Sequence, residues 1–203
     1  EALDTAEVKY VIAGGAIRQV CSLRNRPADD IDIFFYSQAD YEKAVNRLDG
    51  SVYGNVCVFA KETPVSCILL YKWEESQRED PFTMKLNLIK PETVKFTTVE
   101  ELISQFDFTV NRIALISDTE ALADPQFLED DEKGVLRLKF IHCPISSVNR
   151  IAKYTRKGYH CKLKEIVKLF VDWDNRDFTY RENVLKILDE SPTEDDLLTA
   201  YRL

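Results

Sequence analysis

The sequence predicts an α/β protein in which strands and helices surround one sheet and a smaller, wholly helical part follows. Two observations support this fold class. Up to about residue 116, short apolar runs typical of buried strands alternate with stretches of helical spacing. From Ile145 onward, apolar residues recur at helical spacing. With 203 residues, the chain is long enough for one substantial domain and a helical appendage.

The first expected elements are a strand, a glycine turn and a helix. Residues 10–13 are a short apolar run that predicts a buried strand. Gly14 and Gly15 follow, and glycine lets the backbone turn sharply and come close to a ligand. Arg18 is then expected one turn into a helix. The N-terminal N–H groups of such a helix can bind phosphate.

The next expected strand carries two acids within an apolar run, Asp-Ile-Asp-Ile-Phe-Phe at residues 30–35. Because side chains alternate between the faces of a strand, Asp30 and Asp32 are expected to point the same way. Paired carboxylates offer hard oxygen ligands to a divalent cation, Mg²⁺ or Mn²⁺. A cation, a triphosphate and two strand-borne acids are the parts needed for phosphoryl or nucleotidyl transfer.

The remaining elements follow from the same two kinds of pattern. The expected strands are 52–60, 67–71 and 82–89. The expected helices are 37–48, 99–105, 110–115, 177–188 and one that begins at Ser191. Ser37 and Thr98 are candidate N-caps, and Ser191 forms a capping box with Glu194. Residues 73–81 predict a polar loop, and residues 124–137 predict a turn-rich connection.

Composition limits the possible functions. The net charge of −8 argues against a surface devoted to nucleic-acid binding. No run approaches the roughly 18 apolar residues of a membrane span, so we expect no membrane partner. The five cysteines are an odd, scattered set without a Cys-x-x-Cys pair, which favours a protein of the reducing cytoplasm. The oligomeric state is left open.

Positive charge is concentrated in the helical part. Residues 145–171 hold seven basic side chains and one acid, whereas residues 172–203 hold four basic side chains and nine acids. Arg150, Lys153 and Lys157 are spaced so that they share one helix face. That face is either solvated or forms a wall of a nucleotide cleft.

The first motif resembles the nucleotidyltransferases of the DNA polymerase beta type, in particular the head of bacterial tRNA CCA-adding enzymes and poly(A) polymerases. In that family the motif is Gly-Gly-x-x-Arg followed by Asp-x-Asp, which matches Gly14, Gly15, Arg18, Asp30 and Asp32. The resemblance implies an α+β head with a mixed sheet flanked by helices over residues 1–120. A connection over 121–144 and a small all-helical neck over 145–203 would follow. The acids would be catalytic and hold the metal, and the glycines and arginine would hold a nucleoside triphosphate.

A second motif extends the resemblance. Residues 106–111, Phe-Asp-Phe-Thr-Val-Asn, resemble the family's Arg-Arg-Asp-Phe-Thr-x-Asn-Ala, and Arg150 falls in the family's neck motif, Glu-Asp-x-x-Arg-Ile. The resemblance implies that Asp107, Asn111, Arg150 and Lys153 contact the nucleotide. Two alternatives stay open at this point: Asp107 as an ordinary helix N-cap and Asn111 as a structural hydrogen-bond partner.

The sequence also departs from the family pattern. Gln105 and Phe106 replace the Arg-Arg pair, Ser146 and Ser147 replace the base-reading Glu-Asp, and residues 84–90 carry no third acid. We therefore expect weak discrimination among bases.

The leading functional hypothesis is metal-dependent transfer of a nucleoside monophosphate from a triphosphate to an unknown acceptor, which is an RNA end, a protein or a small molecule. The alternative is a catalytically weakened nucleotide-binding or interaction module that retains the fold. A third hypothesis is a partner subunit, or one member of a paired system of a mobile element.

Overall fold

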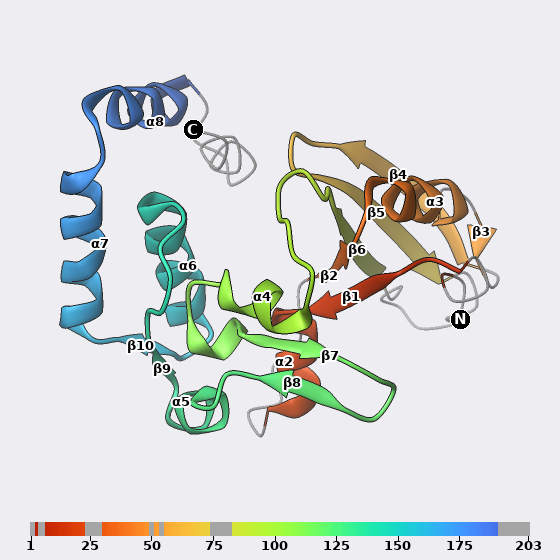
Figure 1. The fold of residues 1–203 in the computed structure, drawn as a ribbon, viewed down its shortest axis with the longest axis horizontal. Helices are drawn as coiled ribbons and strands as arrows, with labels where there is room; N and C mark the ends of the chain where they lie inside the picture. The colour runs from red at the N-terminus through yellow and green to blue at the C-terminus, as the bar shows by residue number, and fades with distance from the viewer. Residues whose placement is uncertain are drawn as a thin grey trace.

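A computed structural model describes residues 3, 7–22, 30–48, 51–52, 55–73 and 83–190. Within these residues, eight strands form one sheet in the order β3-β4-β5-β6-β2-β1-β7-β8 (Figure 1). The strands are β1 (Tyr10–Ala13), β2 (Ile31–Phe35), β3 (Ser51–Val52), β4 (Asn55–Glu62), β5 (Ser66–Trp73), β6 (Thr83–Ile89), β7 (Ile113–Leu115) and β8 (Ala121–Ala123). The short strands β9 (Val135–Leu136) and β10 (His160–Cys161) pair separately.

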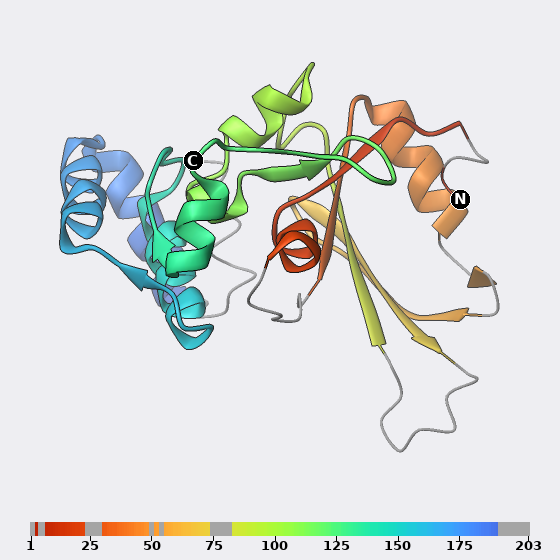
Figure 2. The same ribbon diagram turned by 90° about the horizontal axis from the view of Figure 1, so that it is seen from below.

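One set of helices flanks the sheet, and a second set follows it in the chain as a separate group. The head helices are α2 (Gly15–Cys21), α3 (Gln38–Leu48), α4 (Val99–Ser104), the 3₁₀ turn η1 (Thr109–Asn111) and α5 (Phe127–Lys133). The helices of the second group are α6 (Pro144–Arg156), α7 (Leu163–Asn175) and α8 (Phe178–Glu190). We call the sheet with its helices the head, and residues 144–190 the neck. In Figures 1 and 2, α2 lies between the neck and the strands β4–β6.

The sheet is mixed, which confirms the predicted fold class. Within the eight-stranded sheet, β2 and β6 run parallel and the other neighbouring strands described are antiparallel. Strand β2 is buried on both faces because its apolar side chains alternate between two cores. Ile33 and Phe35 pack into the core beneath α3, whereas Phe34 packs with Leu102 of α4. Asp32, two residues before Phe34, therefore lies on the Phe34 face of the sheet.

Two helix starts are capped as the sequence predicts. The Ser37 hydroxyl accepts a hydrogen bond from the backbone N–H of Asp40, at the start of α3. The Thr98 hydroxyl accepts one from the N–H of Glu101, at the start of α4. Each side chain satisfies one of the N–H groups that a helix start leaves without an internal partner.

Three expected elements differ from the structure. The predicted helix over 110–115 is wrong: the chain forms η1 and then β7, because β1 offers an edge on which Ala114 pairs with Ala13. The expected strand over 52–60 is split into β3 and β4. The expected connection over 121–144 contains β8, which belongs to the main sheet, and the charged helix α5.

Some expectations lie outside the described residues. The last helix, expected from Ser191, is one, and most of the loop expected over 73–81 is another. No helix in the described ranges combines the length and the apolar character that crossing a membrane requires.

Candidate functional site

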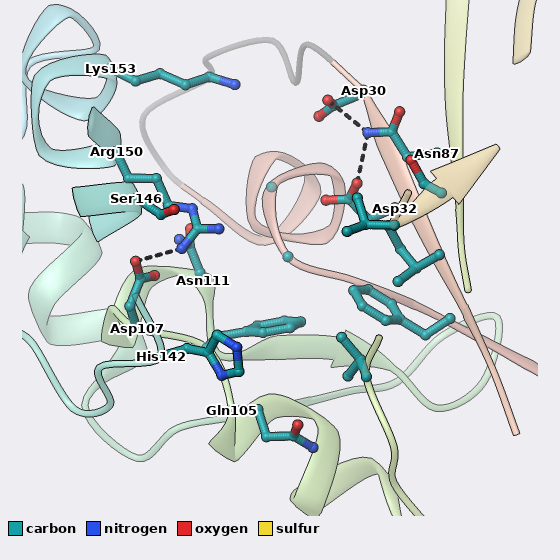
Figure 3. Close-up of a pocket in the computed structure, with 18 of the residues that line it drawn as sticks. Asp30, Asp32, Asn87, Gln105, Asp107, Asn111, His142, Ser146, Arg150 and Lys153 are labelled. Carbon is teal, nitrogen blue, oxygen red and sulfur yellow. Dashed lines mark hydrogen bonds and ion pairs between the residues drawn. The ribbon is translucent and has the colours of Figure 1, made fainter. Parts of the chain in front are cut away.

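The nine residues that the sequence predicts for the site all line one pocket of about 350 Å³. The pocket lies between helix α6 and one face of the sheet, the face of β2 and β6 that carries Asp32. Figure 3 shows Asp30 and Asp32 on one side of it and Arg150 and Lys153 on the other. The predicted residues are Gly14, Gly15, Arg18, Asp30, Asp32, Asp107, Asn111, Arg150 and Lys153.

The glycine turn joins β1 to α2 at the edge of this pocket. Gly14 has φ 80° and ψ −136°, a conformation that L side chains rarely adopt, and its N–H donates to the Ile113 carbonyl at 2.8 Å. A Cβ built on Gly14 would lie 3.7 Å from Asp32 Oδ2, whereas one on Gly15 meets nothing within 4 Å. The turn backbone thus lies beside the carboxylate, and the space above Gly15 is open.

The two acids converge on one amide group. Asp32 lies on β2 directly opposite Asn87 of β6 in the parallel pair. Asn87 Nδ2 donates to Asp30 Oδ2 and to Asp32 Oδ1, both at 2.9 Å (Figure 3). The expectation that Asp30 and Asp32 share a face is confirmed. Lys85 Nζ lies 3.8 Å from Asp30 Oδ2.

The acid pair carries unfavourable electrostatics. Burial and the neighbouring charge of Asp30 raise the pKa of Asp32 to about 6, although Asn87, Lys153 and Arg150 act in the opposite direction. Because Asp32 is hard to ionise in this site, a positive charge placed beside it would stabilise its ionised form. No group of three or more His, Cys, Asp and Glu side chains with metal-ligating geometry occurs among the residues described. Two converging carboxylate oxygens nevertheless fit the hard-oxygen preference of Mg²⁺ or Mn²⁺.

Arg18 joins the helix after the glycine turn to the neck. Its side chain is 2 % exposed, and its Nη1 donates to the Tyr159 hydroxyl at 2.7 Å. The guanidinium carbon lies 5.1 Å from the ring centre of Tyr154 and 5.4 Å from that of Tyr159, as in cation–π contacts. The Tyr159 hydroxyl donates in turn to Asp131. Much of the guanidinium is therefore engaged by tyrosines, and its role as a triphosphate ligand stays a prediction.

Asp107 is not a helix cap in this structure. Its carboxylate is buried and accepts hydrogen bonds from the Phe108 N–H, from Ser147 Oγ at 3.0 Å and from Arg150 Nη1 at 2.8 Å. Asn111 accepts a hydrogen bond from the Tyr154 hydroxyl, which agrees with the structural alternative for this residue. Both residues tie the head to α6 while they line the pocket.

Ser146, on the pocket side of α6, has no side-chain hydrogen-bond partner in the part of the chain that the structure describes. The Ser146 side chain is 7 % exposed. The residue lines the pocket together with Asn149 and His142. The serine thus brings one unsatisfied hydroxyl to the site, where an Arg–carboxylate template would bring several groups.

Several side chains at the site were not predicted from the sequence. The place of Asn87 depends on strand register, and the contacts of Tyr154 and Tyr159 depend on how the neck packs. His142 also lines the pocket without having been assigned to it. One signal was available for Asn87, because it is a polar residue within the largely apolar second half of β6.

Comparison with known proteins shows the family and the fold of the chain. A model described as "Gabija anti-defense 2 family protein" matches residues 2–133, which is more than half of the chain. The chain belongs to the Gabija anti-defense 2 family. A curated relative, "Gabija anti-defense 2" of Bacillus phage SPbetaL7, is 29% identical over 217 residues, covering 91% of this chain and 50% of the relative. The chain thus spans about half the length of the curated relative that it matches.

Solved structures similar to this Gabija anti-defense 2 family protein include CCA-adding enzymes. A complex of a CCA-adding enzyme with CTP has a TM-score of 0.55 at 18% identity, covering 100% of this chain and 49% of that one. The Thermotoga maritima enzyme complexed with tRNA gives 0.53 at 15%, covering 85% and 40%. The Bacillus stearothermophilus enzyme with CTP gives 0.51 at 14%, covering 84% and 40%. At these identities the likeness establishes the nucleotidyltransferase fold.

Proposed function

We propose that this Gabija anti-defense 2 family protein is a nucleotidyltransferase that depends on a divalent cation. It transfers a nucleoside monophosphate from a nucleoside triphosphate to a hydroxyl acceptor. Its relative's name states an action against Gabija, and we propose that the transfer serves the same end here. The observation that carries the proposal is the convergence of Asp30 and Asp32 on one point of a pocket whose opposite wall is basic.

Each part of the pocket has a role in this reaction. The backbone of the turn at Gly14 and Gly15 lies beside Asp32 and opens to the pocket, where it would contact phosphates. Lys153 and Arg150 face Asp32 across the pocket and attract the polyphosphate. A divalent cation held by Asp30 and Asp32 would neutralise phosphate charge. Held between these groups, the triphosphate presents its α-phosphorus to the acceptor.

The transfer breaks a phosphoanhydride bond of the triphosphate and forms a phosphoester bond to the acceptor. The acceptor hydroxyl oxygen forms a bond to the α-phosphorus, and the bond between that phosphorus and the oxygen leading to the β-phosphate breaks. Pyrophosphate leaves, and the hydroxyl proton is released to solvent. The chain's own contribution is to bring the two reactants together and to oppose negative charge with the basic side chains of α6.

Base recognition is proposed to be weak. Ser146 offers a single hydroxyl to the base, and Arg150 is already held by Asp107 at 2.8 Å. A pocket with a single polar contact separates ligands by roughly 1–3 kcal/mol, whereas a buried hydrogen-bonding template separates them much further. The protein should therefore accept more than one nucleoside triphosphate.

Label transfer tests the proposal and identifies the acceptor. The protein is incubated with each α-³²P nucleoside triphosphate, Mg²⁺ or Mn²⁺, and lysate from bacteria with or without Gabija. The expected result is pyrophosphate release together with label in macromolecules. Sensitivity of the label to ribonuclease or to protease separates an RNA end from a protein acceptor, and label in small molecules identifies the third class. Absence of label with every nucleotide and both lysates contradicts the proposal.

A second candidate function is favoured by one specific observation. Strand β6 brings no acid to the pocket, and the carboxylates that converge on Asn87 are Asp30 and Asp32 alone among the described residues. The chain would then bind a nucleotide without transferring it and act as an interaction module. Tight nucleotide binding without pyrophosphate release in any lysate would support this candidate.

A further inference from the structure

Asn87 occupies the point at which the two acids of the pocket converge. It faces Asp32 across the parallel β2–β6 pair, and its Nδ2 lies 2.9 Å from one oxygen of Asp30 and 2.9 Å from one oxygen of Asp32. A cation held by both carboxylates would contact the same oxygens. The amide therefore lies where it would either bind such a cation or compete with it for the carboxylate oxygens.

The other end of the same amide lacks a partner. Asn87 Oδ1 is buried and has no hydrogen-bond partner among the described residues. A half-turn about the Cβ–Cγ bond exchanges the positions of Oδ1 and Nδ2, which are nearly equal in size. Without a cation, that turn would place three oxygens together and is unfavourable. With a divalent cation between them, three hard oxygens are a favourable set of ligands.

We propose that Asn87 supplies the third protein oxygen to the divalent cation, its amide turning as the cation enters between Asp30 and Asp32. In the geometry described above, the same amide bridges the carboxylates through its N–H groups and reduces their repulsion. The inference rests on the proposed function, because it concerns the same cation site. It explains how a strand without a third acid completes that site with a neutral ligand.

The competing role for Asn87 is a bridge alone. In that role the amide holds the carboxylates in place, and a cation must displace it. The two roles predict opposite effects when the amide is removed. Loss of a ligand weakens cation binding, whereas loss of a competitor strengthens it.

The test measures Mn²⁺ binding to the full chain in the absence of nucleotide, from the electron paramagnetic resonance signal of free Mn²⁺. The variants are Asn87→Ala and Asn87→Asp, with Asn46→Ala, an exposed asparagine of α3 that does not line the pocket, as the matched control. We expect Asn87→Ala to weaken Mn²⁺ binding about tenfold or more. Asn87→Asp, which keeps an oxygen and adds charge, should bind at least as tightly as the wild type. Asn46→Ala should match the wild type. Circular dichroism and a thermal melt confirm that each variant is folded.

The outcomes separate this inference from the proposed function. Mn²⁺ binding by Asn87→Ala that equals or exceeds that of the wild type overturns the ligand role and leaves the cation site standing. If Asn87→Ala does not fold, Asn87→Asp decides, since binding weaker than in the wild type overturns the role. Absence of Mn²⁺ binding by the wild type at millimolar concentrations contradicts the proposed cation site as well as this inference.

Discussion

At the scale of single residues, the two glycines of the turn have different physical requirements. Gly14 needs its positive φ, whereas Gly15 faces open space in the pocket. We predict that Gly14→Ala lowers the free energy of unfolding by about 1–3 kcal/mol, because an alanine is strained in that conformation. Gly15→Ala should leave stability unchanged but weaken triphosphate binding, since its methyl group projects into the pocket.

Urea denaturation and nucleotide-binding calorimetry on the two variants check this prediction, and each variant serves as the control for the other. Equal stability loss in both would show that the turn conformation differs from the one described. Unchanged nucleotide binding by Gly15→Ala would place the phosphates elsewhere.

The carboxylate of Asp32 makes the stability of the protein depend on pH. Burial and Asp30 raise its pKa to about 6, above the value of an unfolded aspartate. The native state therefore binds more protons than the unfolded state between about pH 4 and pH 6, and this group lowers stability as pH rises through that window. Asp32→Asn removes the effect. We predict that the variant's stability gain over the wild type is near zero at pH 4 and reaches about 1–3 kcal/mol at pH 8.

Urea denaturation of wild type and Asp32→Asn at both pH values, without divalent cations, measures the difference. A gain that does not change with pH would show that Asp32 ionises as freely in the native state as in the unfolded chain.

Sequence patterns predict these residues to different extents. Gly14, Gly15, Asp30 and Asp32 are predictable, because a turn after a strand and a two-residue period fix their places locally. The partners of Asp107 and Asn111 are not, because they come from α6, about forty residues further along the chain. Nothing local in the sequence records such contacts.

At the scale of elements, the basic residues at the end of α6 differ in whether they line the pocket. Lys153 and Lys157 line the pocket, whereas the exposed Arg156 lies between them in sequence and does not. We predict that Lys153→Glu and Lys157→Glu each weaken triphosphate binding about tenfold, because each replaces attraction for the phosphates with repulsion. Arg156→Glu should bind as the wild type does.

Calorimetric titration with a nucleoside triphosphate, repeated at low and high salt, measures the effect. The difference among the variants should shrink as salt screens the charges. Equal loss in all three would indicate a general surface effect and argue against a nucleotide wall on α6.

The contact of Arg18 with Tyr159 holds α2 and the neck together. We predict that Arg18→Met and Tyr159→Phe each lower the free energy of unfolding by about 1–3 kcal/mol, because each leaves buried polar partners unsatisfied. The double variant should lose at least about 1 kcal/mol less than the sum of the single losses. Burial raises the pKa of Tyr159 to about 12, so the hydroxyl stays protonated throughout a measurement at neutral pH.

A double-mutant cycle by urea denaturation gives this coupling energy. Arg47→Met on α3 is the control for loss of an exposed arginine, and it should change stability by less than about 0.5 kcal/mol. Additive losses in the cycle would mean that the contact does not connect the two elements energetically.

Helices were predicted correctly from the sequence where the local residue pattern determines them. The cap residues and apolar spacing of α3 and α4 specify a helix without help from the rest of the chain. Residues 113–115 form a strand because the edge of β1 is available to pair with them, and that edge is a tertiary feature. The charged helix α5 was missed because its sequence, Phe-Leu-Glu-Asp-Asp-Glu-Lys, carries little apolar periodicity.

At the scale of the whole molecule, the basic side chains lie where the two parts of the fold face each other. The protein as a whole is acidic, with a net charge of −8, yet basic side chains of α6 gather where the neck faces the acid pair of the head. Such an arrangement suits a small polyanion with its cation better than a long nucleic-acid duplex. The order of motifs along the sequence predicted this two-part architecture, but only the folded chain shows how the neck contacts the head.

Pyrophosphate release measures whether the proposed nucleotidyl transfer depends on Asp30 and Asp32. The wild type, Asp30→Asn, Asp32→Asn and the control Arg156→Gln are compared with one triphosphate, Mn²⁺ and lysate from Gabija-carrying bacteria. We predict release by the wild type and the control, and a loss of about a hundredfold or more in each aspartate variant. Release by Asp30→Asn and Asp32→Asn at the wild-type rate would contradict the proposed role of the two acids.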